Sequence, residues 1–156
     1  MKRDLIILEE DKAWARARIA ELDAEIQALG PEFYDVFNQS SETWHDNAPF
    51  DALRDRQSVL DAERQQLRSL LRGSLPSVPK ALQGVVGIGS RVALGSGETY
   101  FIAGDWTPFA GKKHGGAMVI SSGSPLASAL MAKKVGDTVV LGGKTLGVIG
   151  TIGSSL

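Results

Sequence analysis

The chain has 156 residues, of which 43% are hydrophobic and 22% charged, and its formal net charge is -1. It contains no cysteine, which excludes disulfides and thiolate metal sites and fits a reducing cytoplasm. No apolar run approaches the roughly 18 residues of a transmembrane helix, and the N-terminal run Leu5–Leu8 is too short for a secretory signal. Residues 1–78 carry 10 basic and 15 acidic side chains, whereas residues 79–156 carry 7 and 3, which indicates two modules with different partners.

A first long helix is predicted from Asp4 to Leu29. Apolar residues recur there at alternating steps of three and four, the pattern of helices that pack along their whole length. We expect Gly30-Pro31 to kink or briefly break this helix, because proline lacks a backbone N–H. The stripe then resumes up to Asn38. Its members are Leu8, Ala15, Ile19, Leu22, Ile26, Leu29, Phe33, Val36 and Phe37, with Lys12 as the polar member.

A second helix is predicted from Pro49 or Phe50 to about Arg72. Proline suits a first helical turn, where its missing N–H would have no partner in any case. The facing seam consists of Phe50, Leu53, Gln57, Leu60, Arg64, Leu67 and Leu71. About 24 residues span roughly 36 Å at 1.5 Å per residue. Two such helices predict an antiparallel coiled-coil hairpin that stands out as an arm docked to a second module, with its tip at residues 40–48.

The turn between these helices carries more chemistry than a helical hairpin needs. It contains Glu42, Trp44, His45 and Asp46. Two carboxylates alone cannot hold Mg²⁺, which usually needs six oxygen ligands, but they could complete a metal site supplied by another macromolecule. The alternative is that Asp46 only caps the second helix and Glu42 is a solvated side chain. Trp44 favours a functional tip, because an indole at such a turn is a common interface anchor.

The pattern changes after a predicted linker over residues 73–79. Sixteen of the 18 glycines lie beyond it, between short strand-like runs. A short helix is predicted from Pro125, with Ser124 as its cap. The predicted strands are residues 91–94, 99–102, 118–120, 138–141 and 146–149, with hairpin turns at 94–98 and 141–144. The expected fold class is therefore α+β, with a helical hairpin at residues 1–75 and a small antiparallel sheet with one short helix at residues 80–156.

Other motifs carry weaker signals. The glycines of Gly84–Ser90 are not followed by a helix or a Walker lysine, so tight sheet geometry explains them better than phosphate binding. Two histidines are too few for a conventional zinc site without thiolates. The segment Lys112–Gly116 is a basic loop, either simply solvated or a contact for nucleic acid or an acidic protein surface.

With these elements in place, the chain resembles the Gre-factor family, bacterial transcript-cleavage factors with an N-terminal coiled-coil hairpin and a C-terminal FKBP-like domain. The strongest likeness is the run Ile120–Val139, similar to the family pattern I-S-x-x-S-P-L-A-x-A-L-x-G-K-x-x-G-D-x-V. The runs Val86–Ser90 and Tyr100–Gly104 are similar to the first two strands of that domain. The resemblance covers nearly the whole chain.

The resemblance implies that the hairpin enters the secondary channel of RNA polymerase. Tip acids of the family help to place a second Mg²⁺ and a water at the polymerase active site, so that backtracked RNA is cut. Here Asp46 stands at the family's glutamate position, Thr43 stands where the family has its first aspartate, and Glu42 lies one residue earlier. The implied catalytic and metal-binding residues are Asp46 and Glu42, acting only jointly with the polymerase. The implied partner-binding residues are Thr43, Trp44, His45, Asn47, Arg54 and Arg56.

The sequence thus predicts a cytoplasmic, monomeric transcription elongation factor that is not itself an enzyme. Its expected partner is RNA polymerase, with indirect contact to nascent RNA. No cofactor is expected to be held by the factor alone. Three alternatives stay open. The altered tip could block or tune transcription without cleavage. The FKBP-like resemblance could indicate a peptide-binding or isomerase module, although fold alone is poor evidence for activity. The seam could serve a structural coiled-coil adaptor, which would self-associate.

Overall fold

The computed structural model describes residues 4–40 and 48–154. Contacts divide these residues into two compact units. Residues 4–12 group with residues 73–154 in what we call the sheet unit, and the described residues of Ala13–Arg72 form the helical unit. The predicted domain limits, 1–75 and 80–156, stay a prediction, and in this grouping residues 4–12 lie with the sheet.

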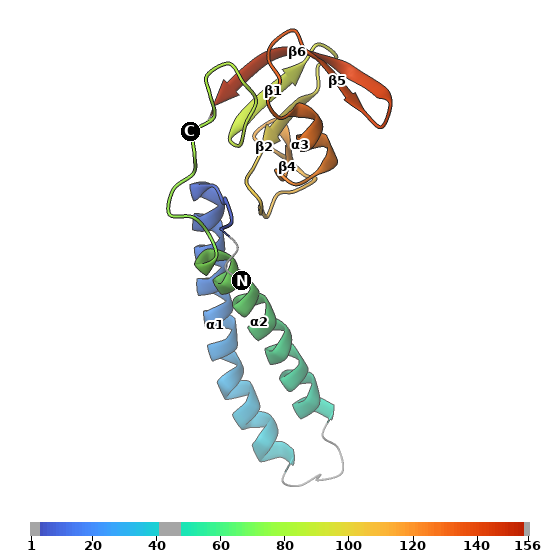
Figure 1. The fold of residues 1–156 in the computed structure, drawn as a ribbon. Helices are drawn as coiled ribbons and strands as arrows, with labels where there is room; N and C mark the ends of the chain where they lie inside the picture. The colour runs from blue at the N-terminus through green and yellow to red at the C-terminus, as the bar shows by residue number, and fades with distance from the viewer. Residues whose placement is uncertain (1–3, 41–47, 155–156) are drawn as a thin grey trace. The chain divides into compact units, whose positions relative to one another are not determined.

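The helical unit is a pair of long helices that lie side by side (Figure 1). The helix α1 spans Glu9–Ser40 and α2 spans Ala48–Arg72, so the predicted limits of the second helix are correct to within about a residue. The predicted seams supply the buried residues, which in this unit are Ala15, Leu22, Leu29, Leu60 and Leu67. Burial of apolar side chains every third or fourth residue therefore holds the two helices together.

The first helix differs from its prediction in two respects. It begins at Glu9 rather than Asp4, and it does not break at Gly30 and Pro31, whereas a kink at that point stays a prediction. Proline here removes one backbone hydrogen bond, but Gln27 and Pro31 are both exposed, so water can satisfy the freed carbonyl of Gln27. Solvent exposure makes the proline tolerable at this point.

Residues 4–8 are non-helical because they bind to the rest of the sheet unit. The N–H of Ile6 donates to Asp105 Oδ2 at 2.7 Å, and the N–H of Asp105 donates to the Ile6 carbonyl at 2.6 Å. A Cβ on Gly104 would lie 2.1 Å from the Ile6 oxygen, so only glycine permits this approach. Leu5 also pairs with the start of the linker: its N–H donates to Gly73 and its carbonyl accepts from Leu75, both at 2.8 Å.

The sheet unit contains a six-stranded sheet in the order β3-β4-β2-β1-β6-β5 within the described residues. The strands are β1 (Ser90–Leu94), β2 (Thr99–Ile102), β3 (Lys113–His114), β4 (Ala117–Ile120), β5 (Thr138–Leu141) and β6 (Lys144–Ser154). Neighbouring strands are antiparallel except β2 and β4, which run parallel. All five predicted strands are present. The strand β3 was not predicted, because two residues are too few to show a period.

The short helix α3 (Pro125–Leu130) packs its buried residues into the main core of the sheet unit. As predicted, the Ser124 side chain accepts a hydrogen bond from Ala127 N–H, and proline occupies the first turn. The fully buried core side chains include Val92, Ile102, Leu130, Val139 and Ile149. The predicted α+β fold class, with a helical hairpin, a mainly antiparallel sheet and one short helix, is confirmed.

Beyond α3, Ala132 is the one described non-glycine residue with a positive φ, at 64°. Its N–H donates to the Val86 carbonyl at 2.9 Å, which fixes the turn. The left-handed region disfavours residues with a Cβ, so this turn is held at some energetic cost.

Candidate functional site

The predicted tip residues lie outside the described residues. These are Glu42, Thr43, Trp44, His45, Asp46 and Asn47. What the structure does place are the helix ends on either side of them, Ser40 on α1 and Ala48 on α2 (Figure 1). Whether the two carboxylates approach one another therefore stays a prediction.

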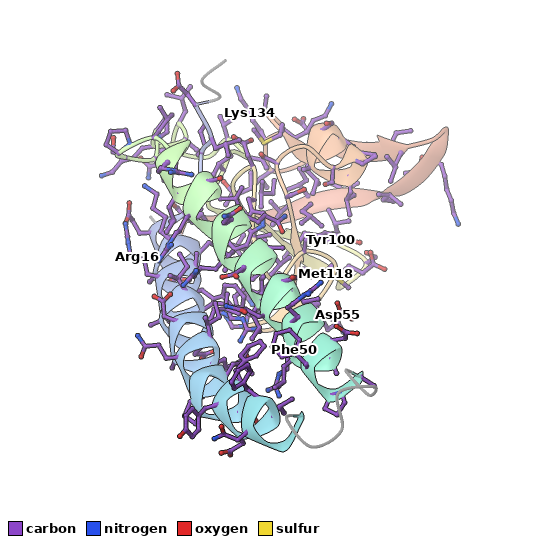
Figure 2. All side chains as sticks on the ribbon, turned by 90° about the horizontal axis from the view of Figure 1, so that it is seen from below. Arg16, Phe50, Asp55, Tyr100, Met118 and Lys134 are labelled. Carbon is purple, nitrogen blue, oxygen red and sulfur yellow. The ribbon has the colours of Figure 1, made fainter. Side chains whose placement is uncertain are left out.

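The helix ends that lead to the tip are joined by an aromatic contact. Phe33 of α1 and Phe50 of α2 meet edge to face, with ring centroids 5.6 Å apart and an interplanar angle of 73°. Figure 2 shows Phe50 extending from α2 toward α1. Such pairs add about 0.5–1.5 kcal/mol beyond the area they bury. This contact fixes the spacing of the helices close to the tip.

The same end of the helical unit presents polar and aromatic side chains to solvent. The predicted partner-binding residues Arg54 and Arg56 are both exposed on α2. On α1, Tyr34 and Phe37 each keep 68% of their surface exposed. Exposed cations and aromatic rings are the residue types enriched at the anchors of protein interfaces. Neither aromatic residue was among the predicted partner contacts: Phe37 was assigned to the apolar stripe, and Tyr34 was not singled out.

Ion pairs connect the two helices farther from the tip. Arg18 donates to Glu63 through Nε at 2.6 Å and Nη2 at 3.0 Å, a two-pronged contact. Arg64 donates to Asp23 at 2.6 Å and to Asp61 at 2.8 Å. The hydrogen bonds from Arg18 lower the pKa of the Glu63 carboxyl group, and Asp23 raises the pKa of Arg64. These bonds fix the register of α1 against α2.

No group of three or more His, Asp or Glu side chains among the described residues could hold a metal ion. The predicted metal residues, Asp46 and Glu42, lie outside that part of the chain. In the described ranges, no helix combines the length and apolar character needed to cross a membrane.

A second site, which was not predicted from the sequence, lies within the sheet unit. It is a pocket of about 230 Å³ lined by Leu8, Glu10, Asp11, Arg91, Phe101, Thr107, Phe109, His114, Gly115 and Val119. Asp11 is only 5% exposed, and its Oδ2 atom has no hydrogen-bond partner in the described part of the protein. In the sequence it is one of three consecutive acids at a helix start, a pattern that normally indicates exposed side chains.

Burial strongly raises the pKa of the Asp11 carboxyl group. The pKa of Asp11 rises to about 6, chiefly because burial disfavours the charged form, and the neighbouring charge of Glu10 adds to the rise. A hydrogen bond with Thr107 and the proximity of His114 act in the opposite direction. A buried acid whose charge is poorly compensated is a marker of functional sites.

Comparisons with known proteins agree on one family. Residues 81–146 match the family model described as the C-terminal domain of the transcription elongation factors GreA/GreB. The transcription elongation factor GreA of Geobacillus kaustophilus (strain HTA426) is 32% identical over 104 residues, which cover 62% of this chain. The chain spans 61% of the length of that relative.

Among solved structures, the GreA factor homolog 1 (Gfh1) of Thermus thermophilus aligns at 20% identity over 97% of this chain and 99% of that one, with a TM-score of 0.39. The Gfh1 of Thermus aquaticus aligns at 20% identity over 96% and 98%, also with a TM-score of 0.39. Because both TM-scores are below 0.5, we draw no functional conclusion from these two alignments.

Residues 81–146 are thus a domain of the Gre type. Over residues 81–146 the resemblance to the Gre-factor family is confirmed.

Proposed function

We propose that this protein binds RNA polymerase through its secondary channel and stimulates the polymerase's own cleavage of backtracked RNA. The observation that carries the proposal is the pairing of a Gre-type domain with a long helical hairpin whose turn bears acids. The helix α2 alone has 25 residues, which at 1.5 Å per residue makes a rod of roughly 37 Å. A rod of this length suits delivery of charged groups to a recessed site.

In this proposal the factor is not itself an enzyme. Asp46 is the principal carboxylate and Glu42 its partner, and both complete the binding of Mg²⁺ at the polymerase active site. Two metal ions there would stabilise the attacking and leaving oxygens of the displacement. Thr43, Trp44, His45 and Asn47 would contact the polymerase around its active site.

The helical unit supplies the rigidity that such a mechanism needs. A misplacement of about 1 Å can cost a hundredfold in rate, so the carboxylates must be presented by a stiff support. The Phe33–Phe50 contact and the two-pronged Arg18–Glu63 pair fix the helices against each other at two levels. The exposed side chains of Arg54 and Arg56 are free to meet the negatively charged groups that surround a polymerase active site.

The test is RNA cleavage in a stalled, backtracked elongation complex of the cognate polymerase with Mg²⁺. We expect the protein to accelerate shortening of the RNA 3′ end. Asp46→Asn should reduce that acceleration by at least about tenfold, the low end of what losing a supporting group at a metal site costs. Asp51→Asn, at an exposed position on α2, is the matched control and should retain the wild-type rate. No acceleration by the wild-type protein would refute cleavage.

One sequence observation favours a second candidate, in which the protein occupies the channel and inhibits transcription without cleavage. Thr43 stands where the family pattern has its first aspartate. In the same assay, slower elongation without RNA shortening, retained in the Glu42→Ala/Asp46→Ala double variant, would establish this second function. Thr43→Asp should then introduce cleavage if the missing carboxylate is the cause.

A further inference from the structure

The pocket around Asp11 lies wholly within the sheet unit, and nothing in the proposed cleavage mechanism uses it. Its walls come from the start of α1, from β1, β2, β3 and β4, and from the segment between β2 and β3. At about 230 Å³ it can hold a group the size of one large side chain but not a nucleotide. The ligand must therefore be compact.

One carboxylate oxygen in the pocket accepts no hydrogen bond from any described residue. Asp11 is 95% buried, and its Oδ2 finds no donor among the described residues. The adjacent cation Lys12 does not serve it, because its Nζ donates to the Leu75 carbonyl at 2.6 Å and to Glu9 at 3.3 Å. A buried carboxylate with an unpaired oxygen is costly, so an incoming N–H donor, above all a charged one, would be strongly favoured. The Cβ–Cγ torsion of aspartate is soft, so the free oxygen can turn toward a ligand.

The remaining walls suit a flat ligand. Phe109 and His114 stack at 4.2 Å between ring centroids with an interplanar angle of 10°. Leu8, Phe101 and Val119 complete an apolar lining. Aromatic faces attract cations, with a gain that grows when the cation is desolvated.

The charges that face the pocket favour a cation on balance. Glu10 adds a second carboxylate at the rim. The opposing groups are His114, whose proximity lowers the pKa of Asp11, and Arg91, which is exposed and whose Nη2 donates to the Gly115 carbonyl at 2.7 Å. The charge of Arg91 is screened by solvent, whereas that of buried Asp11 is not.

We propose that this pocket binds a compact, planar organic cation, a guanidinium or amidinium group, whose N–H groups pair with Asp11 and whose flat face lies on the outer face of the Phe109–His114 stack. The same chemistry is offered by a free small molecule and by an arginine side chain of a partner protein. The pocket does not include the tip. A failure of ligand binding at the pocket would therefore leave the proposed cleavage function unaffected, and a failure of cleavage would leave the pocket proposal unaffected.

The test is calorimetric titration of the full-length protein at pH 7.5 with benzamidinium, a planar amidinium, and with benzamide as its neutral isostere. We expect benzamidinium to bind with a Kd of about 1 mM or tighter, as suits so small a ligand. Benzamide should bind at least about tenfold more weakly, because a charge-assisted hydrogen bond is lost. This comparison uses the wild-type protein alone, so it does not depend on how any variant folds.

Variants then locate the site. Asp11→Asn should weaken benzamidinium binding by at least about tenfold, whereas Asp4→Asn, at an exposed position of the same unit, should leave it unchanged. Equal binding of benzamide and benzamidinium, or unchanged affinity in Asp11→Asn, would overturn the proposal, as would the absence of saturable binding. A peptide with one internal arginine, compared with its citrulline counterpart, distinguishes the sources. Tighter binding of the arginine peptide than of benzamidinium identifies a protein side chain, and the reverse identifies a free small molecule.

Discussion

Replacing Asp11 by asparagine should stabilise the sheet unit at neutral pH and leave it unchanged in acid. The folded protein holds the pKa of Asp11 at about 6, against an ordinary value of 3.8. The folded state therefore binds the proton more tightly than the unfolded chain does. Well below pH 3.8 both states are protonated and burial carries no charge penalty. As the pH rises from about 4 through 6 the folded state loses stability, and the loss persists above that range.

The size of the effect follows from the shift. About two pH units at 1.36 kcal/mol each give an upper limit of about 3 kcal/mol. Because the carboxyl group borders an open pocket, solvent reduces this, and we expect about 1–2 kcal/mol. Asparagine is nearly isosteric and still accepts a hydrogen bond from Thr107, so the variant removes the charge penalty with little other change.

The measurement is urea unfolding at pH 3 and pH 7.5, followed by NMR signals of the buried methyl groups of Val92 and Ile102, which report on the sheet unit alone. Asp11→Asn should raise the free energy of unfolding by about 1–2 kcal/mol at pH 7.5 and by almost nothing at pH 3. Asp4→Asn provides the exposed control. A variant that is equally stable to the wild type at both pH values, or less stable at pH 7.5, would refute the idea that burial penalises the Asp11 charge.

Three further predictions concern the two units separately. Leu22 is fully buried, so Leu22→Ala should lower the unfolding free energy of the helical unit by about 3 kcal/mol in circular dichroism melts, while Val59→Ala, at a position 68% exposed, should change it by less than about 0.5 kcal/mol. A double-mutant cycle of Arg18→Ala and Glu63→Ala should give a coupling of about 0.5–1 kcal/mol that shrinks in 1 M salt, and a coupling insensitive to salt would contradict an ionic pair. Ala132→Gly should stabilise the sheet unit by about 0.5–1 kcal/mol, because relief of the left-handed strain exceeds the added entropy of the unfolded chain, and any loss of stability would count against that strain.

The features that the sequence predicted correctly are those set by local periodicity and turn chemistry. The limits of α2 follow from a proline at the first turn and an apolar seam, and α3 follows from the Ser124–Pro125 cap. The strand β3 escaped prediction because its two residues are selected by pairing with β4 rather than by their own pattern. A kink or brief break was expected at Pro31 because a sequence does not show that Gln27 and Pro31 are both exposed to solvent.

Of the two candidate sites, the tip was predicted from the sequence and the pocket was not. The acids and aromatics of the tip were found from an unusual turn composition, and their arrangement stays a prediction because they lie outside the described residues. The pocket was missed because its walls are far apart in the chain, from Leu8 to Val119. Asp11 is buried only because residues 4–8 bind the sheet through Asp105, a long-range event that no local pattern encodes.

The attachment of residues 4–12 to residues 73–154 makes the sheet unit discontinuous in sequence, with the two helices as an insertion in it. The hydrogen bonds of Leu5 with Gly73 and Leu75 bring the two entry points together, so a short loop could bridge them and the insertion could lengthen or shorten without disturbing the sheet. A fragment cut at residue 80 would, by contrast, lack buried Ile7 and Leu8 and expose the surface that they cover. Any fragment meant to preserve the sheet unit must therefore contain residues 4–12 as well as residues 73–154.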